Sequence, residues 1–68
     1  MSVEEMNDIL NKAKSWKGPS GYRRVVSINK EKDSKYYTIY EVDPTGTKTV
    51  FRQFSIDINT GTVYNNNQ

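Results

Sequence analysis

The hydrophobic period of the chain changes once, between residues 17 and 22, and this change limits the fold more than any other feature. Before the change, apolar side chains recur at the three- and four-residue spacing of one helix face. They are Val3, Met6, Ile9, Leu10, Ala13 and Trp16. After Gly21, apolar and polar side chains alternate with the period of two that is typical of strands. Gly18 and Pro19 lie between the two patterns and predict the end of a helix, so we expect one helix followed by strands.

The predicted helix covers residues 3–17 and has signals at both ends. Ser2 and Glu5 have the spacing of a capping box, in which each side chain accepts a hydrogen bond from the other residue's amide. Acidic residues lie in the first turn and lysines in the last turns, which is the order that the helix dipole favours. We expect the apolar stripe, including Trp16, to be buried against a sheet.

The rest of the chain is rich in strand-forming residues and turn signals. The predicted strands cover residues 22–28, 35–43, 47–58 and 62–64. Between the second and third strands, Pro44 fixes φ and Gly46 accepts a left-handed conformation, which is typical of a tight turn. We therefore expect a single domain over residues 1–68 with an α+β fold. Its N-terminal helix packs on one face of a three- to four-stranded antiparallel meander sheet.

The turn at residues 43–46 also predicts the register of the central hairpin. A three-residue loop with a bulge pairs Asp43 with Thr47, and counting outward places Ile39 opposite Phe51. The even-numbered face then holds most of the apolar side chains and is the predicted core, with Trp16 between it and the helix. Its members are Tyr36, Tyr40, Val42, Val50, Phe54, Ile56 and Ile58.

The odd-numbered face is then left without a covering layer, because a single helix covers only one face of the sheet. Its predicted contact residues for a protein partner or for a second copy of the chain are Tyr37, Ile39, Phe51 and Gln53. Uncovered apolar side chains in a cluster are typical of interaction surfaces. A bulge near Gln53 would reverse the two faces. The candidate surface would in that case be Tyr36, Tyr40 and Phe54.

The sequence contains few of the residues and motifs that catalysis or metal binding requires. It has no His and no Cys, which excludes the usual zinc ligand sets, and it has no nucleophile or phosphate-loop motif. We expect no catalytic residue, no cofactor and no metal. The spacing of Asp57, Asn59 and Gly61 begins like a calcium loop, but the twelfth position is Gln68 instead of a bidentate Glu. These residues therefore predict a turn.

A small single-stranded nucleic-acid-binding protein is an alternative, because cations beside aromatic rings can hold stacked bases. The residues for that role are Arg23, Arg24, Tyr37 and Lys48. The net charge is only +2, and the lysines between residues 30 and 35 alternate with acidic residues. Because affinity for nucleic acid depends on neutralising phosphates, we expect nucleic acid to be an unlikely partner.

No apolar run approaches the ~18 residues of a membrane-spanning helix, and the first residues do not have the pattern of a signal peptide. We expect no membrane span. Localisation stays open: the chain is cytoplasmic if it is complete, and belongs to the cell envelope or is secreted if it is a domain excised from an exported protein.

The order of a short helix, then GYRRVVSI, YYTIYEVD and FRQFSIDINTGTVY, resembles a PepSY-type domain. Six residues take the positions of the closing motif of that family: Phe54, Ile56, Asp57, Thr60, Gly61 and Val63. The resemblance implies a non-enzymatic, exported module of the kind found in protease propeptides and bacterial envelope proteins, which binds or restrains a protein. We therefore expect a protein-binding or inhibitory module that acts through the open sheet face. A homodimeric phage or host accessory protein is a further alternative.

Overall fold

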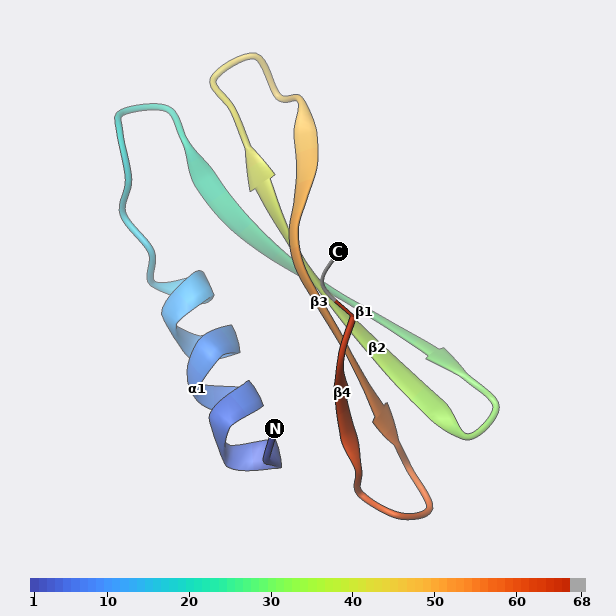
Figure 1. Cartoon of the computed structure of the whole chain (residues 1–68). Coiled ribbons are helices and arrows are strands. Elements are labelled where there is room, and N and C mark those ends of the chain that lie inside the picture. Colours follow the sequence, from blue (N-terminus) through green and yellow to red (C-terminus); the bar gives the residue numbers. More distant parts are fainter. Residues whose placement is uncertain (67–68) are drawn as a thin grey trace.

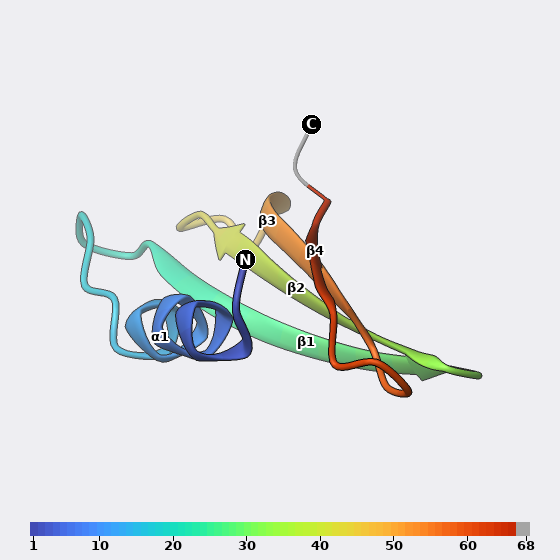
Figure 2. The ribbon, with the colours of Figure 1, turned by 60° about the horizontal axis from the view of Figure 1, so that its bottom comes forward.

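The computed structural model describes residues 1–66, which form a helix and an antiparallel sheet with the strand order β1-β2-β3-β4. The elements are α1 (Val3–Lys14), β1 (Arg23–Glu31), β2 (Ser34–Val42), β3 (Lys48–Asp57) and β4 (Val63–Asn65). Figures 1 and 2 show that α1 lies on one side of the twisted sheet, close to β1. The predicted α+β fold, an N-terminal helix packed on an antiparallel meander, is confirmed.

The helix begins as predicted and ends three residues earlier than predicted. At its start, the Glu5 amide donates to Ser2 Oγ at 3.0 Å and the Ser2 amide donates to Glu5 Oε1 at 3.3 Å. At its end, the Ser15 hydroxyl donates to the Asn11 carbonyl at 3.2 Å. A serine that bonds to carbonyl groups of the preceding turn competes with continuation of the helix, so α1 ends at Lys14.

The core lies between α1 and the sheet. It is a cluster of buried apolar side chains from the helix, β2, β3 and β4: Met6, Leu10, Ala13, Ile39, Phe54 and Val63. Half-buried side chains that pack around this cluster are Ile9, Val26, Tyr37 and Ile56. The helix therefore covers the face that carries Tyr37 and Ile39, and the prediction that it covers the even-numbered face of β2 is wrong.

A β-bulge in β3 explains this error. Near the turn, Tyr40 pairs with Val50 as predicted, but Ile39 pairs with Arg52 and leaves Phe51 as an extra residue. Beyond the bulge, Phe54 pairs with Tyr37. An extra residue in one strand of a pair moves all later side chains of that strand to the other face. The bulge considered as an alternative is present, although it lies at Phe51 instead of near Gln53.

The bulge divides the predicted core between the two faces. Phe54 and Ile56 lie in or against the core under the helix. Tyr40 and Val50 pair with each other on the opposite face. Tyr40 lies there because it alternates with Ile39 along β2, and Val50 because it precedes the bulge in β3. Ile58 follows β3 and is exposed.

Trp16 is half-buried beside the core on the helix side of the sheet, so its predicted position against the even-numbered face is wrong. Its ring lies 4.2 Å from Arg24 Cζ, and the ring of Phe51 lies 3.7 Å from the same atom. A guanidinium between two aromatic rings is held by cation–π attraction. Arg24 Nη2 also lies 3.4 Å from Glu41 Oε2. A Cβ at Gly18 would clash with the Trp16 ring, so Gly18 lets the ring adopt this position.

The turn between β2 and β3 is held by the Asp43 carboxylate. Asp43 Oδ1 accepts from the amides of Thr45 at 2.9 Å and Thr47 at 3.0 Å, and from the Thr45 hydroxyl at 2.6 Å. The hydrogen bonds from Thr45 and Thr47 lower the pKa of Asp43 below its ordinary value of 3.8. Gly46 has a φ of 90°, as predicted from the turn chemistry.

Candidate binding surface

The sheet has a second face, turned away from α1, which we call the open face. It carries alternate residues of the strands, and their pairing sets them in five rows across the sheet. From the end at the Asp43 turn, the rows are Arg23 with Val42 and Lys48; Val25 with Tyr40 and Val50; Ser27 with Thr38 and Gln53; Asn29 with Tyr36 and Ser55; Glu31 with Ser34 and Asp57. Tyr64 of β4 extends the fourth row, because it pairs with Ser55.

The second row is apolar (Val25, Tyr40 and Val50), and in the fourth row Tyr36 and Tyr64 alternate with the polar Asn29 and Ser55; we call these two rows the tyrosine rows. Val50 is 58% exposed and Tyr64 is 53% exposed, while Val25, Tyr36 and Tyr40 are half-buried. No helix or strand of the described residues lies over this face (Figure 2), although Val42 of the first row, Thr38 of the third and Ser55 of the fourth are buried among their neighbours. Isolated exposed apolar residues are common, but a group on one sheet face is typical of a contact surface.

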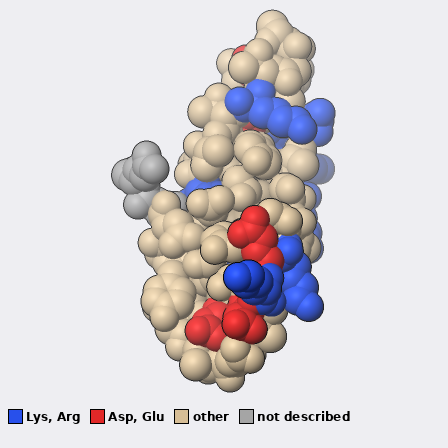
Figure 3. All heavy atoms as spheres, turned by 90° about the vertical axis from the view of Figure 1, so that its right-hand side faces the viewer, with Lys and Arg blue, Asp and Glu red and all other residues tan. Residues whose placement is uncertain are grey.

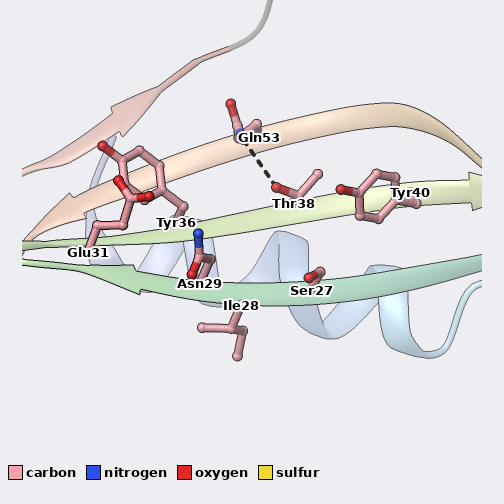
Figure 4. A pocket seen from close by; sticks show the side chains of 8 residues that line it. All are labelled: Ser27, Ile28, Asn29, Glu31, Tyr36, Thr38, Tyr40 and Gln53. Carbon is pink, nitrogen blue, oxygen red and sulfur yellow. Dashed lines mark hydrogen bonds between the residues drawn. The ribbon is translucent and has the colours of Figure 1, made fainter.

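A hollow of about 570 Å³ lies on the open face between the two tyrosine rows. Its lining residues are Ser27, Ile28, Asn29, Glu31, Tyr36, Thr38, Tyr40 and Gln53. Figure 4 shows Tyr36, Thr38, Tyr40 and Gln53 on the same side of the sheet, whereas the Ile28 side chain points to the opposite side. Gln53 Nε2 donates to Thr38 Oγ1 at 3.2 Å, which fixes the polar floor of the hollow.

Charged residues lie at the two ends of the open face. Arg23 and Lys48 form the basic end, and Lys48 Nζ lies 5.8 Å from the centre of the Tyr40 ring. Glu31 and Asp57 form the acidic end, four residues beyond the polar middle row on β1 and β3. The face therefore has opposite charges at its ends and no charged residue in the three rows between them.

The predicted partner-binding residues do not lie together on an uncovered surface. Ile39 is 0% exposed and belongs to the core. Tyr37 packs against that core, and Phe51 stacks on Arg24 on the helix side. The prediction that these three side chains form an uncovered cluster is therefore wrong. Gln53 alone of the four lies on the open face, and its role in binding stays a prediction.

The residues of the nucleic-acid alternative are also divided between the faces. Arg23 and Lys48 lie on the open face, whereas Arg24 is held between two rings and Tyr37 packs against the core. Figure 3 shows Lys and Arg atoms intermingled with Asp and Glu atoms in the lower part of that view. The four residues of the nucleic-acid alternative therefore do not form the continuous basic surface that phosphate binding favours.

The Asp57 loop is the predicted turn. Asp57 Oδ1 accepts from the amides of Asn59 at 2.9 Å and Thr60 at 3.2 Å, and Gly61 has a φ of 74°. Gln68, the twelfth position of the calcium pattern, lies outside the described residues. Within residues 1–66, no three His, Cys, Asp or Glu side chains are grouped as a metal site would require.

Sequence reasoning missed Val25, Val50 and Tyr64 as members of the open face. It named Tyr36 and Tyr40 only for the alternative with a bulge, and it placed Phe54 with them, although Phe54 is in the core. One signal could have revealed them. Phe51 and Phe54 are three positions apart in the same strand, and an odd spacing places two large apolar residues on one face only if a bulge lies between them.

Comparison with family models, with curated proteins and with solved structures found no match to this chain. Among the helices of residues 1–66, none is long and apolar enough to cross a membrane.

Proposed function

We propose that this chain is a non-enzymatic protein-binding module and that the open face is its contact surface. The observation that carries the proposal is the group formed by Tyr36, Tyr40, Val50 and Tyr64 on a face that no described element covers. Burying such side chains is favourable by about 25 cal/mol per Å² of apolar surface. A domain of this size has a marginal core of its own, so it gains from a partner.

The chemistry of the open face supports a protein as the occupant. Aromatic anchors with polar groups around them are the usual composition of the centre of a protein interface. Tyr is favoured there because its ring contributes contact area while its hydroxyl stays hydrogen-bonded. The resemblance to PepSY-type domains implies the same class of function, a module that binds or restrains a protein.

Site-specific photo-crosslinking tests this proposal in the organism that encodes the chain. A photoreactive phenylalanine analogue replaces Tyr64 or Val50, one position at a time. The control position is Val3, which is 40% exposed on α1. We expect a discrete protein adduct from both open-face positions and not from Val3. A second copy of the chain counts as a protein partner in this experiment. Absence of any adduct from Tyr64 and Val50, or equal adducts from Val3, would contradict the proposal.

A further inference from the structure

The five rows of the open face are arranged symmetrically about the middle row. On β1, Arg23 and Glu31 each lie four residues from Ser27, and on β2, Val42 and Ser34 each lie four residues from Thr38. Four residues of strand span about 13 Å, so the basic and acidic ends lie at similar distances from the centre. One tyrosine row lies between each end and the centre.

This symmetry makes the two charged ends of the open face complementary to each other. A two-fold axis along the middle row places row one of one copy against row five of the other. Arg23 then faces Glu31 of the second copy. On β3, Lys48 faces Asp57, and Tyr40 faces Tyr36 on β2. A two-fold axis parallel to the strands would instead bring Arg23 opposite Lys48, which would set like charges against each other.

We propose that the partner of the open face is a second copy of this chain, docked face to face with its strands reversed. This inference rests on the proposed function and names the occupant of the same surface. Each copy contributes its basic end to the acidic end of the other, so every ion pair occurs twice. The sheets stack as in a β-sandwich, and the hollows at the two middle rows face each other. Their hydroxyl and amide groups can be bridged by water, as is common in protein interfaces.

The size of the face sets the expected strength of the dimer. The nine residues of β1 span about 26 Å and the three long strands span about 10 Å, a footprint of roughly 260 Å² per copy, to which the three residues of β4 add little. A stable interface buries about 800 Å² per partner. The dimer is therefore weak, with a dissociation constant of roughly 10 µM to 1 mM. Its affinity falls as salt is added, because its ion pairs lie at the exposed ends of the interface.

Sedimentation velocity of the purified chain at about 10 µM to 1 mM measures the dimer, and charge reversal tests its geometry. Arg23→Glu places two acidic residues at each end contact of its own dimer, and Glu31→Arg places two basic residues there. The dissociation constant of the dimer is expected to be higher by about tenfold or more for each variant alone than for the wild type. An equimolar mixture of the two restores complementary pairs at both contacts, so the mixture dimerises more strongly than either variant.

Lys17→Glu is the control, because it makes the same change of net charge as Arg23→Glu at an exposed position outside the sheet. Its dimerisation is expected to match that of the wild type. Circular dichroism of each variant at low concentration confirms that the monomer is folded, so that a loss of dimer reports on the interface.

The outcomes separate this inference from the proposed function. A wild-type chain that stays monomeric at 1 mM overturns the proposal that the partner is a second copy. Crosslinks from Tyr64 to a different protein would in that case still support the proposed function. A dimer that is insensitive to Arg23→Glu, or a mixture no stronger than its components, overturns the reversed face-to-face arrangement. A dimer formed by pairing the free edge of β1 with the same edge of a second copy would be insensitive to Arg23→Glu in this way. Recovery of the dimer in the mixture supports the arrangement.

Discussion

Replacing Ile39 by Ala should destabilise the fold strongly, because Ile39 lies where the helix and the sheet meet. Its side chain is 0% exposed and belongs to the cluster formed with Leu10 and Phe54. Substitutions of this kind cost about 2–5 kcal/mol, with larger costs where the cavity cannot close. Side chains from both layers surround Ile39, so we expect a loss of about 3–4 kcal/mol. A domain of this length has a free energy of unfolding of only roughly 3–10 kcal/mol.

Urea unfolding followed by circular dichroism measures this loss, and Ile28→Ala is the matched control. Ile28 is also an isoleucine within a strand, but it is 57% exposed. Its replacement should cost less than about 1 kcal/mol. If Ile39→Ala leaves too little folded protein to analyse, Ile39→Val should show a graded loss of about 0.5–1.5 kcal/mol. Equal losses for Ile28→Ala and Ile39→Ala would refute the assignment of Ile39 to the core.

Three further predictions follow from the turns and from the ring stack. Gly18→Ala should displace the Trp16 ring from Arg24, because the added Cβ would clash with that ring. We expect a shift in tryptophan fluorescence and a decrease of about 1 kcal/mol in the free energy of unfolding; an unchanged spectrum would contradict the contact. The folded-state pKa of Asp43 lies below its ordinary value of 3.8, so its carboxylate stabilises the fold above that pH. This stability is lost as the pH falls through the lower folded-state pKa. Asp43→Asn should therefore lose less stability than the wild type between pH 7 and pH 3 in urea unfolding, and an equal loss would argue against this role. Millimolar calcium should not change the melting temperature, because amides of the turn occupy Asp57 Oδ1; an increase of several degrees that a chelator reverses would show a calcium site.

The elements of the fold could be predicted from the sequence because their signals are local. The capping box of Ser2 and Glu5 and the turns at Asp43 and Asp57 are all made by residues within a few positions of each other. The end of α1 was less predictable, because the Ser15 hydroxyl and the Arg24 side chain compete with the helical pattern that reaches Trp16.

The covered face could not be predicted from alternation alone. The register near the turn was right, since Tyr40 pairs with Val50, but the extra residue at Phe51 reversed every later position of β3. The candidate contact residues depend on that register, so alternation alone predicts Ile39 on the surface although it is in the core. The rows of the open face likewise depend on pairings between distant residues, which a single sequence does not contain.

Nuclear Overhauser contacts from the helix methyl groups to the sheet test whether α1 covers the face of Ile39 and leaves the face of Tyr40 and Val50 open. The measurement uses dilute protein, so that contacts within one chain dominate. We expect contacts from the Met6 and Leu10 methyl groups to Ile39 and Phe54. Contacts from the same methyl groups to Tyr40 and Val50, with none to Ile39, would contradict the account.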